Sequence, residues 1–216
     1  MKLELRNVSK SIRRVPILSD INLTLESGTI YGLWGKNGCG KTMLMRVMSG
    51  LIRPTEGTVL VDGKALGGEQ DFPESIGLLL ENPAFLNSYT GYENLMALAE
   101  IRSLIGKERV CEALRQVGLD PEDKRKYRKY SLGMKQRLGI ACAVMEEPDL
   151  ILLDEPINAI DEKGAEEIKK LIVSLKEKGK LIVVACHDRE DLNFLADQVI
   201  YMGEGRITDC RPAEQG

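Results

Sequence analysis

The segment GKNGCGKT, residues 35–42, has the residue types and spacing of a phosphate-binding loop, G-x-x-x-x-G-K-[ST]. Glycines let backbone N–H groups turn toward phosphate oxygens, where a side chain would collide. Lys41 supplies a positive charge for the β and γ phosphates, and the Thr42 hydroxyl can coordinate Mg²⁺. The loop therefore predicts that the chain binds a nucleoside triphosphate. The predicted nucleotide-binding residues of the loop are Gly35, Lys36, Asn37, Gly38, Cys39, Gly40, Lys41 and Thr42.

Two adjacent carboxylates end the apolar run LILLDE, residues 150–155. An ionised carboxylate at the end of a buried strand needs a cation or another partner to offset its desolvation. Asp154 has the position expected of a Mg²⁺ ligand, and Glu155 follows where a base could polarise the attacking water. The alternative is a pair of acids that only meets the start of a helix.

His187 is the single histidine of the chain and ends the apolar run LIVVACH. A lone histidine is more often a structural hydrogen-bonding residue than a catalyst. The carboxyl ends of parallel strands are, however, where α/β sheets bind ligands. This position favours a catalytic role for His187.

The chemistry-bearing residues follow segments that read as a parallel sheet. DLILLDEP and KLIVVACHD are continuous apolar runs of strand length, with a helical pattern between them, which predicts a βαβ unit. Residues 3–8 and 16–26 alternate apolar and polar positions, as antiparallel strands do. We expect a single α/β domain over residues 1–216, namely a P-loop NTPase core with a mostly parallel sheet. An N-terminal antiparallel β subdomain and an inserted α-helical subdomain, approximately residues 84–145, complete it.

The overall composition excludes several classes of protein. With 30 Lys and Arg against 33 Asp and Glu, the net charge of −3 provides no global basic field for nucleic acid or anionic lipid. We interpret the basic run at residues 124–129 as a solvated face. One histidine and five scattered cysteines make a zinc site improbable and suit a reducing cytosol. We expect no signal peptide and no membrane span, so any work at a membrane requires another chain.

The segment YSLGMKQRLGIA, residues 130–141, resembles the signature of ABC-type ATPases. The order of phosphate loop, helical insertion, signature, LILLDEP, INAID and histidine is similar as well. The resemblance implies two subunits facing head to tail, with ATP between one phosphate loop and the partner's signature. The implied residues across that interface are Ser131, Gly133, Met134 and Asp161. For Ser131 the alternative is a plain helix cap without a ligand.

The resemblance also assigns Glu155 as the catalytic base and His187 as the switch residue near the γ-phosphate. Two positions depart from the family pattern. Ile12 occupies the place of the aromatic residue that stacks on adenine, and Glu81 replaces the usual glutamine, which places it as a metal ligand. With its neighbouring segments, Glu81 resembles the branch of bacitracin-resistance and lantibiotic-immunity exporters.

We therefore expect an ATP-hydrolysing subunit of a membrane exporter of a peptide, antibiotic or other amphipathic compound, driven by closure of an ATP-bound dimer. Its expected partners are transmembrane permease subunits and a second copy of itself or a homologous subunit, with no nucleic acid. The chain would lie in the cytoplasm, on the inner face of the membrane through those partners. The alternative is a soluble ABC-type ATPase that acts on nucleic acid or the ribosome. A small-molecule kinase or GTPase would leave the signature unexplained.

Overall fold

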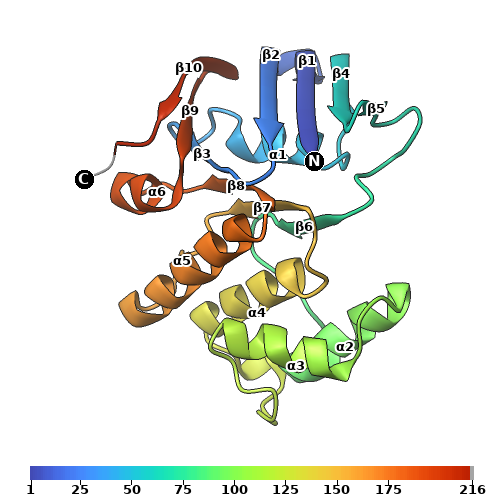
Figure 1. Cartoon of the computed structure of the whole chain (residues 1–216), viewed down its shortest axis with the longest axis vertical. Coiled ribbons are helices and arrows are strands. Elements are labelled where there is room, and N and C mark those ends of the chain that lie inside the picture. The colour runs from blue at the N-terminus through green and yellow to red at the C-terminus, as the bar shows by residue number, and fades with distance from the viewer. Residues whose placement is uncertain (215–216) are drawn as a thin grey trace.

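A six-stranded sheet forms the centre of the molecule in the computed structural model, which describes residues 1–214 (Figure 1). The strand order is β10-β9-β3-β8-β7-β6, and every neighbouring pair from β9 to β6 is parallel. Strands β7 and β8 are buried along their whole length, as their continuous apolar runs predict. The strands are β3 (Ile30–Trp34), β6 (Ile76–Leu79), β7 (Leu150–Asp154), β8 (Leu181–Ala185), β9 (Gln198–Gly203) and β10 (Arg206–Pro212).

A second, antiparallel sheet lies above it and carries the N-terminus (Figure 1). Its strand order is β2-β1-β4-β5, with strands β1 (Lys2–Ile12), β2 (Val15–Glu26), β4 (Glu56–Val61) and β5 (Lys64–Ala65). Helix α1 (Lys41–Met48) lies between the two sheets and contributes Leu44 and Met48 to a core shared by both. The phosphate loop is therefore anchored on both sides by buried apolar contacts.

Three helices gather at the end of the molecule opposite the antiparallel sheet (Figure 1). They are α2 (Gly91–Arg102), α3 (Lys107–Gln116) and α4 (Leu132–Val144), with a short 3₁₀ helix, η1 (Tyr127–Lys129), before α4. Ser103 follows the last residue of α2 as its C-cap, and its left-handed φ of 54° turns the chain toward α3. Within residues 1–214, no helix combines the length and the apolar character needed to cross a membrane.

Helix α5 (Glu162–Glu177) connects β7 to β8 and completes the predicted βαβ unit. Helix α6 (Arg189–Leu195) was not predicted from the sequence. Its cap is Asp188, whose side chain accepts hydrogen bonds from the N–H groups of Glu190 and Asp191. The α/β P-loop fold class is confirmed, whereas the boundaries of the helical subdomain stay a prediction.

Candidate active site

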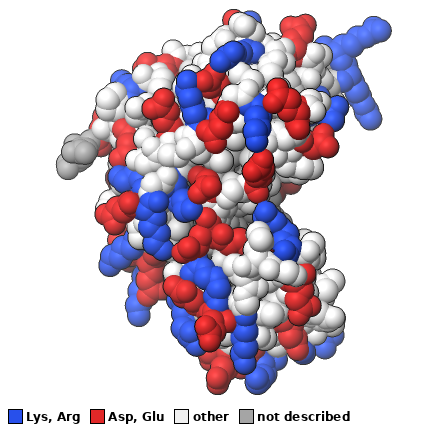
Figure 2. All heavy atoms as spheres, turned by 45° about the vertical axis from the view of Figure 1, so that its right-hand side comes forward, with Lys and Arg blue, Asp and Glu red and all other residues white. Residues whose placement is uncertain are grey.

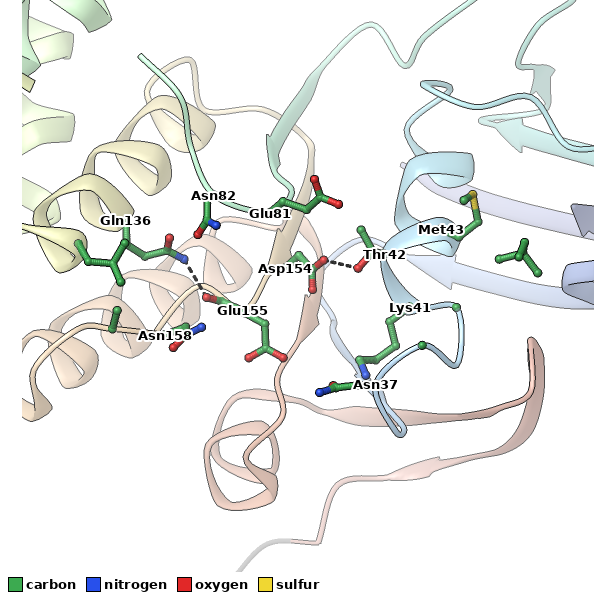
Figure 3. Close-up of a pocket in the computed structure, with 15 residues that line it drawn as sticks. Asn37, Lys41, Thr42, Met43, Glu81, Asn82, Gln136, Asp154, Glu155 and Asn158 are labelled. Atoms are coloured by element: carbon green, nitrogen blue, oxygen red, sulfur yellow. Dashed lines mark hydrogen bonds between the residues drawn. The ribbon is translucent and has the colours of Figure 1, made fainter. Parts of the chain in front are cut away.

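The phosphate loop opens into a cavity of about 540 Å³ at the carboxyl end of the parallel strands. Figure 3 shows the loop and α1 on one side of this cavity and the helical part of the chain on the other. The residues that line it are Ile17, Asn37, Gly38, Gly40, Lys41, Thr42, Met43, Glu81, Asn82, Leu132, Gln136, Asp154, Glu155, Asn158 and Ala159.

The backbone of the phosphate loop is built so closely that only glycine fits at key positions. A Cβ at Gly35 would lie 2.4 Å from the carbonyl oxygen of Met202. Gly40 has a left-handed φ of 108°, and a Cβ there would lie 3.0 Å from Leu18. The ammonium group of Lys41 donates to the carbonyl oxygen of Gly35 at 2.6 Å, so the loop already holds its positive charge at the start of α1. These features fit a bound polyphosphate.

Thr42 and Asp154 present two oxygen atoms at one point of the cavity (Figure 3). The Thr42 hydroxyl donates to a carboxylate oxygen of Asp154 at 2.6 Å. Burial raises the pKa of the Asp154 carboxyl, and the hydrogen bond from Thr42 counters part of that rise. A buried carboxylate beside a hydroxyl is a donor set suited to a hard cation such as Mg²⁺.

Glu155 and His187 are brought into direct contact, although 32 positions separate them in the chain. One carboxylate oxygen of Glu155 lies 2.6 Å from Nδ1 of His187. The backbone of Glu155 is fixed because its N–H donates to Ala185 and its carbonyl accepts a hydrogen bond from Gln136. The hydrogen bond that Nδ1 of His187 donates to the Glu155 carboxylate, together with the charge of that carboxylate, raises the pKa of His187.

We expect an NMR titration of His187, the only histidine in the chain, to give a pKa above its ordinary value of 6.5. Glu155→Gln removes the charge and should bring this pKa back toward 6.5. Because the folded-state pKa is raised, the contact stabilises the fold fully below the unfolded-state pKa, and this stability is lost as the pH rises through the folded-state pKa. An identical titration curve in both proteins would mean that the pair does not form in solution.

The predicted interface residues lie together in a second hollow of about 570 Å³. Ser131 caps α4 by accepting the N–H of Met134, and Gly133 lies so close to the Ala159 carbonyl that a Cβ would approach it to 2.7 Å. Asp161 accepts a hydrogen bond from Arg137. Residues lining this hollow that were predicted from the sequence are Ser131, Gly133, Met134 and Asp161. Within the described chain, none of these four lines the cavity of its own phosphate loop.

Glu81 and Ile12 have surroundings that the sequence did not indicate. Glu81 lines the main cavity, but its carboxylate accepts a hydrogen bond from Arg46 at 2.7 Å. Ile12 is 44% exposed at the end of β1 and is absent from the residues lining this cavity, whereas Ile17 is among them. The proposed contact of Ile12 with adenine stays a prediction.

Sequence reasoning missed several residues that shape the site. Arg46 could have been found from its spacing, because it follows Thr42 by four positions on a predicted helix and therefore shares its face. Gln136, which is buried, gave a weaker signal as a polar residue within the apolar part of the signature helix. Ile17 and Asn158 carried no signal of their own.

The chain matches known proteins over nearly its whole length. A family model described as "ABC transporter" matches residues 18–158. The ABC transporter ATP-binding protein YybJ of Bacillus subtilis, itself uncharacterized, is 43% identical over 95% of this chain and 94% of its own length. The bacitracin transport ATP-binding protein BcrA of Enterococcus faecalis is 40% identical, covering 96% of this chain and 68% of BcrA. The lantibiotic transport ATP-binding protein SrtF of Streptococcus pyogenes is 33% identical over 95% of this chain and 88% of SrtF.

Solved structures agree with this similarity. A dimeric ATP-binding cassette in a post-hydrolysis state, bound to ADP and Pi, superposes with a TM-score of 0.88 at 25% identity. The match covers 99% of this chain and all of that one.

Proposed function

This chain belongs to the ABC transporter family as an ATP-binding, ATP-hydrolysing subunit, and we propose that the transporter it powers is an exporter. The bacitracin and lantibiotic transport proteins among its relatives support a peptide, an antibiotic or another amphipathic compound as cargo. Its place would be the cytoplasmic face of a membrane, held there by a permease.

One observation carries the proposal of a dimer. Lys41, Thr42, Asp154 and Glu155 line one cavity. Ser131, Gly133 and Asp161 line a neighbouring hollow, and of the described residues only Leu132 and Ala159 line both. The signature segment reaches the cavity of its own phosphate loop through Leu132 and Gln136, but Ser131 and Gly133 lie outside that cavity. The separation supports two chains arranged head to tail, so that each hollow faces the other chain's phosphate loop. ATP-driven closure of that dimer would be the power stroke.

Within this site each residue has a distinct role in hydrolysis. Lys41 would exchange the Gly35 carbonyl for a phosphate oxygen, and Glu155 would orient the attacking water and accept its proton. His187 would hold the Glu155 carboxylate in place through the contact at Nδ1. Thr42, Asp154 and Glu81 would hold Mg²⁺, which supplies positive charge against the phosphates when bound.

We further propose that an apolar groove on the helical part receives a segment of the permease. The groove is lined by Leu79, Phe85, Leu86, Leu98 and Ile101, among others. Large apolar side chains with this much exposure favour a protein contact, since Ile101 is 77% exposed and Leu86 is 55% exposed. Figure 2 shows that this face is notched between the core and the helical part, with charged and uncharged side chains at the edge of the notch.

The groove is also connected to the ATP site by the chain itself. Residues 83–86 line the groove and directly follow Glu81 and Asn82, which line the main cavity. The hydroxyl of Tyr127 donates to the carbonyl oxygen of Pro83 at 2.6 Å, which ties this segment to the helical part. A movement at Glu81 would thus reach the permease through residues 81–92.

Ile101→Glu is expected to reduce recovery of a permease with this chain from detergent-solubilised native membranes by about tenfold. An unpaired polar group in an apolar contact costs roughly 1–3 kcal/mol and a charge costs more, which accounts for a loss of at least that size. The ATPase rate of the isolated chain should not change. Phe194→Glu is the matched control, because Phe194 is 58% exposed on α6, away from the groove. Equal recovery with both variants would contradict this docking surface, and recovery of ribosomes or nucleic acid in place of a permease would favour the soluble alternative.

A further inference from the structure

Arg46 and Glu81 form an ion pair between α1 and the loop that leads to the helical part. An Nη atom of Arg46 donates to Oε1 of Glu81 at 2.7 Å, and the two side chains are 33% and 63% exposed. Glu81 itself has a left-handed φ of 61°, a conformation that a residue other than glycine adopts only where its surroundings favour it. The pair therefore joins two segments that are 35 positions apart in the chain.

The pair lies one helical turn from the predicted metal position. Thr42 and Arg46 share a face of α1 because they are four residues apart. Thr42 contacts Asp154, and Arg46 contacts Glu81, so the two acidic side chains are held side by side along the same helix. The negative charge of Glu81 contributes to the raised pKa of Asp154. Glu81 is thus close enough to act on this site electrostatically.

Electrostatic repulsion would act on the Glu81 carboxylate once a nucleoside triphosphate is bound. Asp154, Glu155 and Glu81 all line the cavity, to which a triphosphate would add further negative charge. Arg46 offsets the charge of Glu81 through their ion pair. A divalent cation would compete with the guanidinium for the same carboxylate oxygens.

We propose that Arg46 is a positioning residue that holds Glu81 in the nucleotide-free protein and releases it to Mg²⁺ when ATP binds. The inference rests on the proposed metal ligation by Glu81. The replacement of Arg46 by Mg²⁺ as the partner of Glu81 would move the first residue of the segment 81–92. This movement would transmit metal binding to the groove. The contacts of Glu81 with Arg46 and with a cation depend on its negative charge. A neutral glutamine at this position would form them much more weakly.

The resting contact is tested by thermal unfolding of the parent, Arg46→Met, Glu81→Gln and the double variant. Without nucleotide, the change in Tm of the double variant should differ from the sum of the two single changes by about 1–3 °C. This is the range for a partly exposed ion pair in a chain of this size. With Mg²⁺ and a non-hydrolysable ATP analogue, the non-additivity should disappear. Additive shifts without nucleotide, or a coupling that persists with it, would overturn the proposal.

Metal binding provides the second readout, with Mn²⁺ followed by electron paramagnetic resonance in the presence of the same analogue. Arg46→Met should tighten Mn²⁺ binding about two- to fivefold, because the carboxylate no longer has to leave an ion pair. The same substitution should have no effect in Glu81→Gln. Arg53→Met is the control, since Arg53 makes a comparable exposed pair with Asp71 at 3.0 Å.

The two readouts separate the possible failures. An Arg46→Met effect of equal size with and without Glu81 would mean that Arg46 acts on the metal directly, and would overturn the proposal. Mn²⁺ binding that is unchanged by Glu81→Gln would remove Glu81 from the metal site. In that case release to the metal is wrong, and the unfolding data alone decide whether nucleotide breaks the resting contact.

Discussion

Replacing Glu155 by glutamine is expected to lower ATP hydrolysis by about 10²–10⁴-fold, the usual contribution of a general base, while leaving ATP binding intact. The amide keeps the size and shape of the carboxylate but cannot accept the proton of the attacking water. The backbone contacts of Glu155 with Ala185 and Gln136 do not involve the side chain, so the local fold should persist. ATP would then be bound but not consumed.

Three measurements separate binding from hydrolysis in this variant. Phosphate release gives the rate, and the fluorescence of Trp34, the single tryptophan, reports binding because it directly precedes the phosphate loop. Sizing with ATP and Mg²⁺ should reveal an accumulated dimer. Glu177→Gln, which alters an exposed glutamate at the end of α5, should hydrolyse ATP as the parent does. Parent-like hydrolysis by Glu155→Gln would remove Glu155 from the role of base.

Much of the fold could be predicted from the sequence because the pattern of apolar and polar residues within a strand reflects its burial. The apolar runs of β7 and β8 require burial on both faces, and alternation in β1 and β2 requires one buried face. The resemblance to the bacitracin and lantibiotic branch, carried by short motifs, is confirmed by the similarity to BcrA and SrtF. Helix α6 was missed because its seven residues are too few to give a clear helical period.

The site could be predicted only where residue type and position imply a function. Lys41, Thr42 and Asp154 follow from motifs, and the structure brings all three to one cavity. The pairing of Glu81 with Arg46 depends on how the loop after β6 passes α1, which no local pattern records. The presence of Ile17 rather than Ile12 in the cavity likewise depends on the path of the β1–β2 hairpin.

Two variants that damage opposite halves of the proposed shared site should each abolish hydrolysis. Lys41→Ala removes the positive charge that would hold the β and γ phosphates. Ser131→Arg places a bulky side chain at the start of α4, in the hollow expected to face the other chain's ATP. Each variant alone would form dimers in which both sites are broken.

The central claim, one ATP site shared by two chains, is tested most directly by mixing these two inactive variants and measuring ATP hydrolysis. A heterodimer would contain one site with both halves damaged and one with both halves intact. With free exchange, an equal mixture should regain about a quarter of the parent activity, because half of the dimers carry one working site of two. Mass spectrometry of the mixture would establish that heterodimers form. Recovered activity near that fraction is the predicted result, whereas heterodimers without recovered activity, or a Ser131→Arg variant that is fully active by itself, would contradict the shared site.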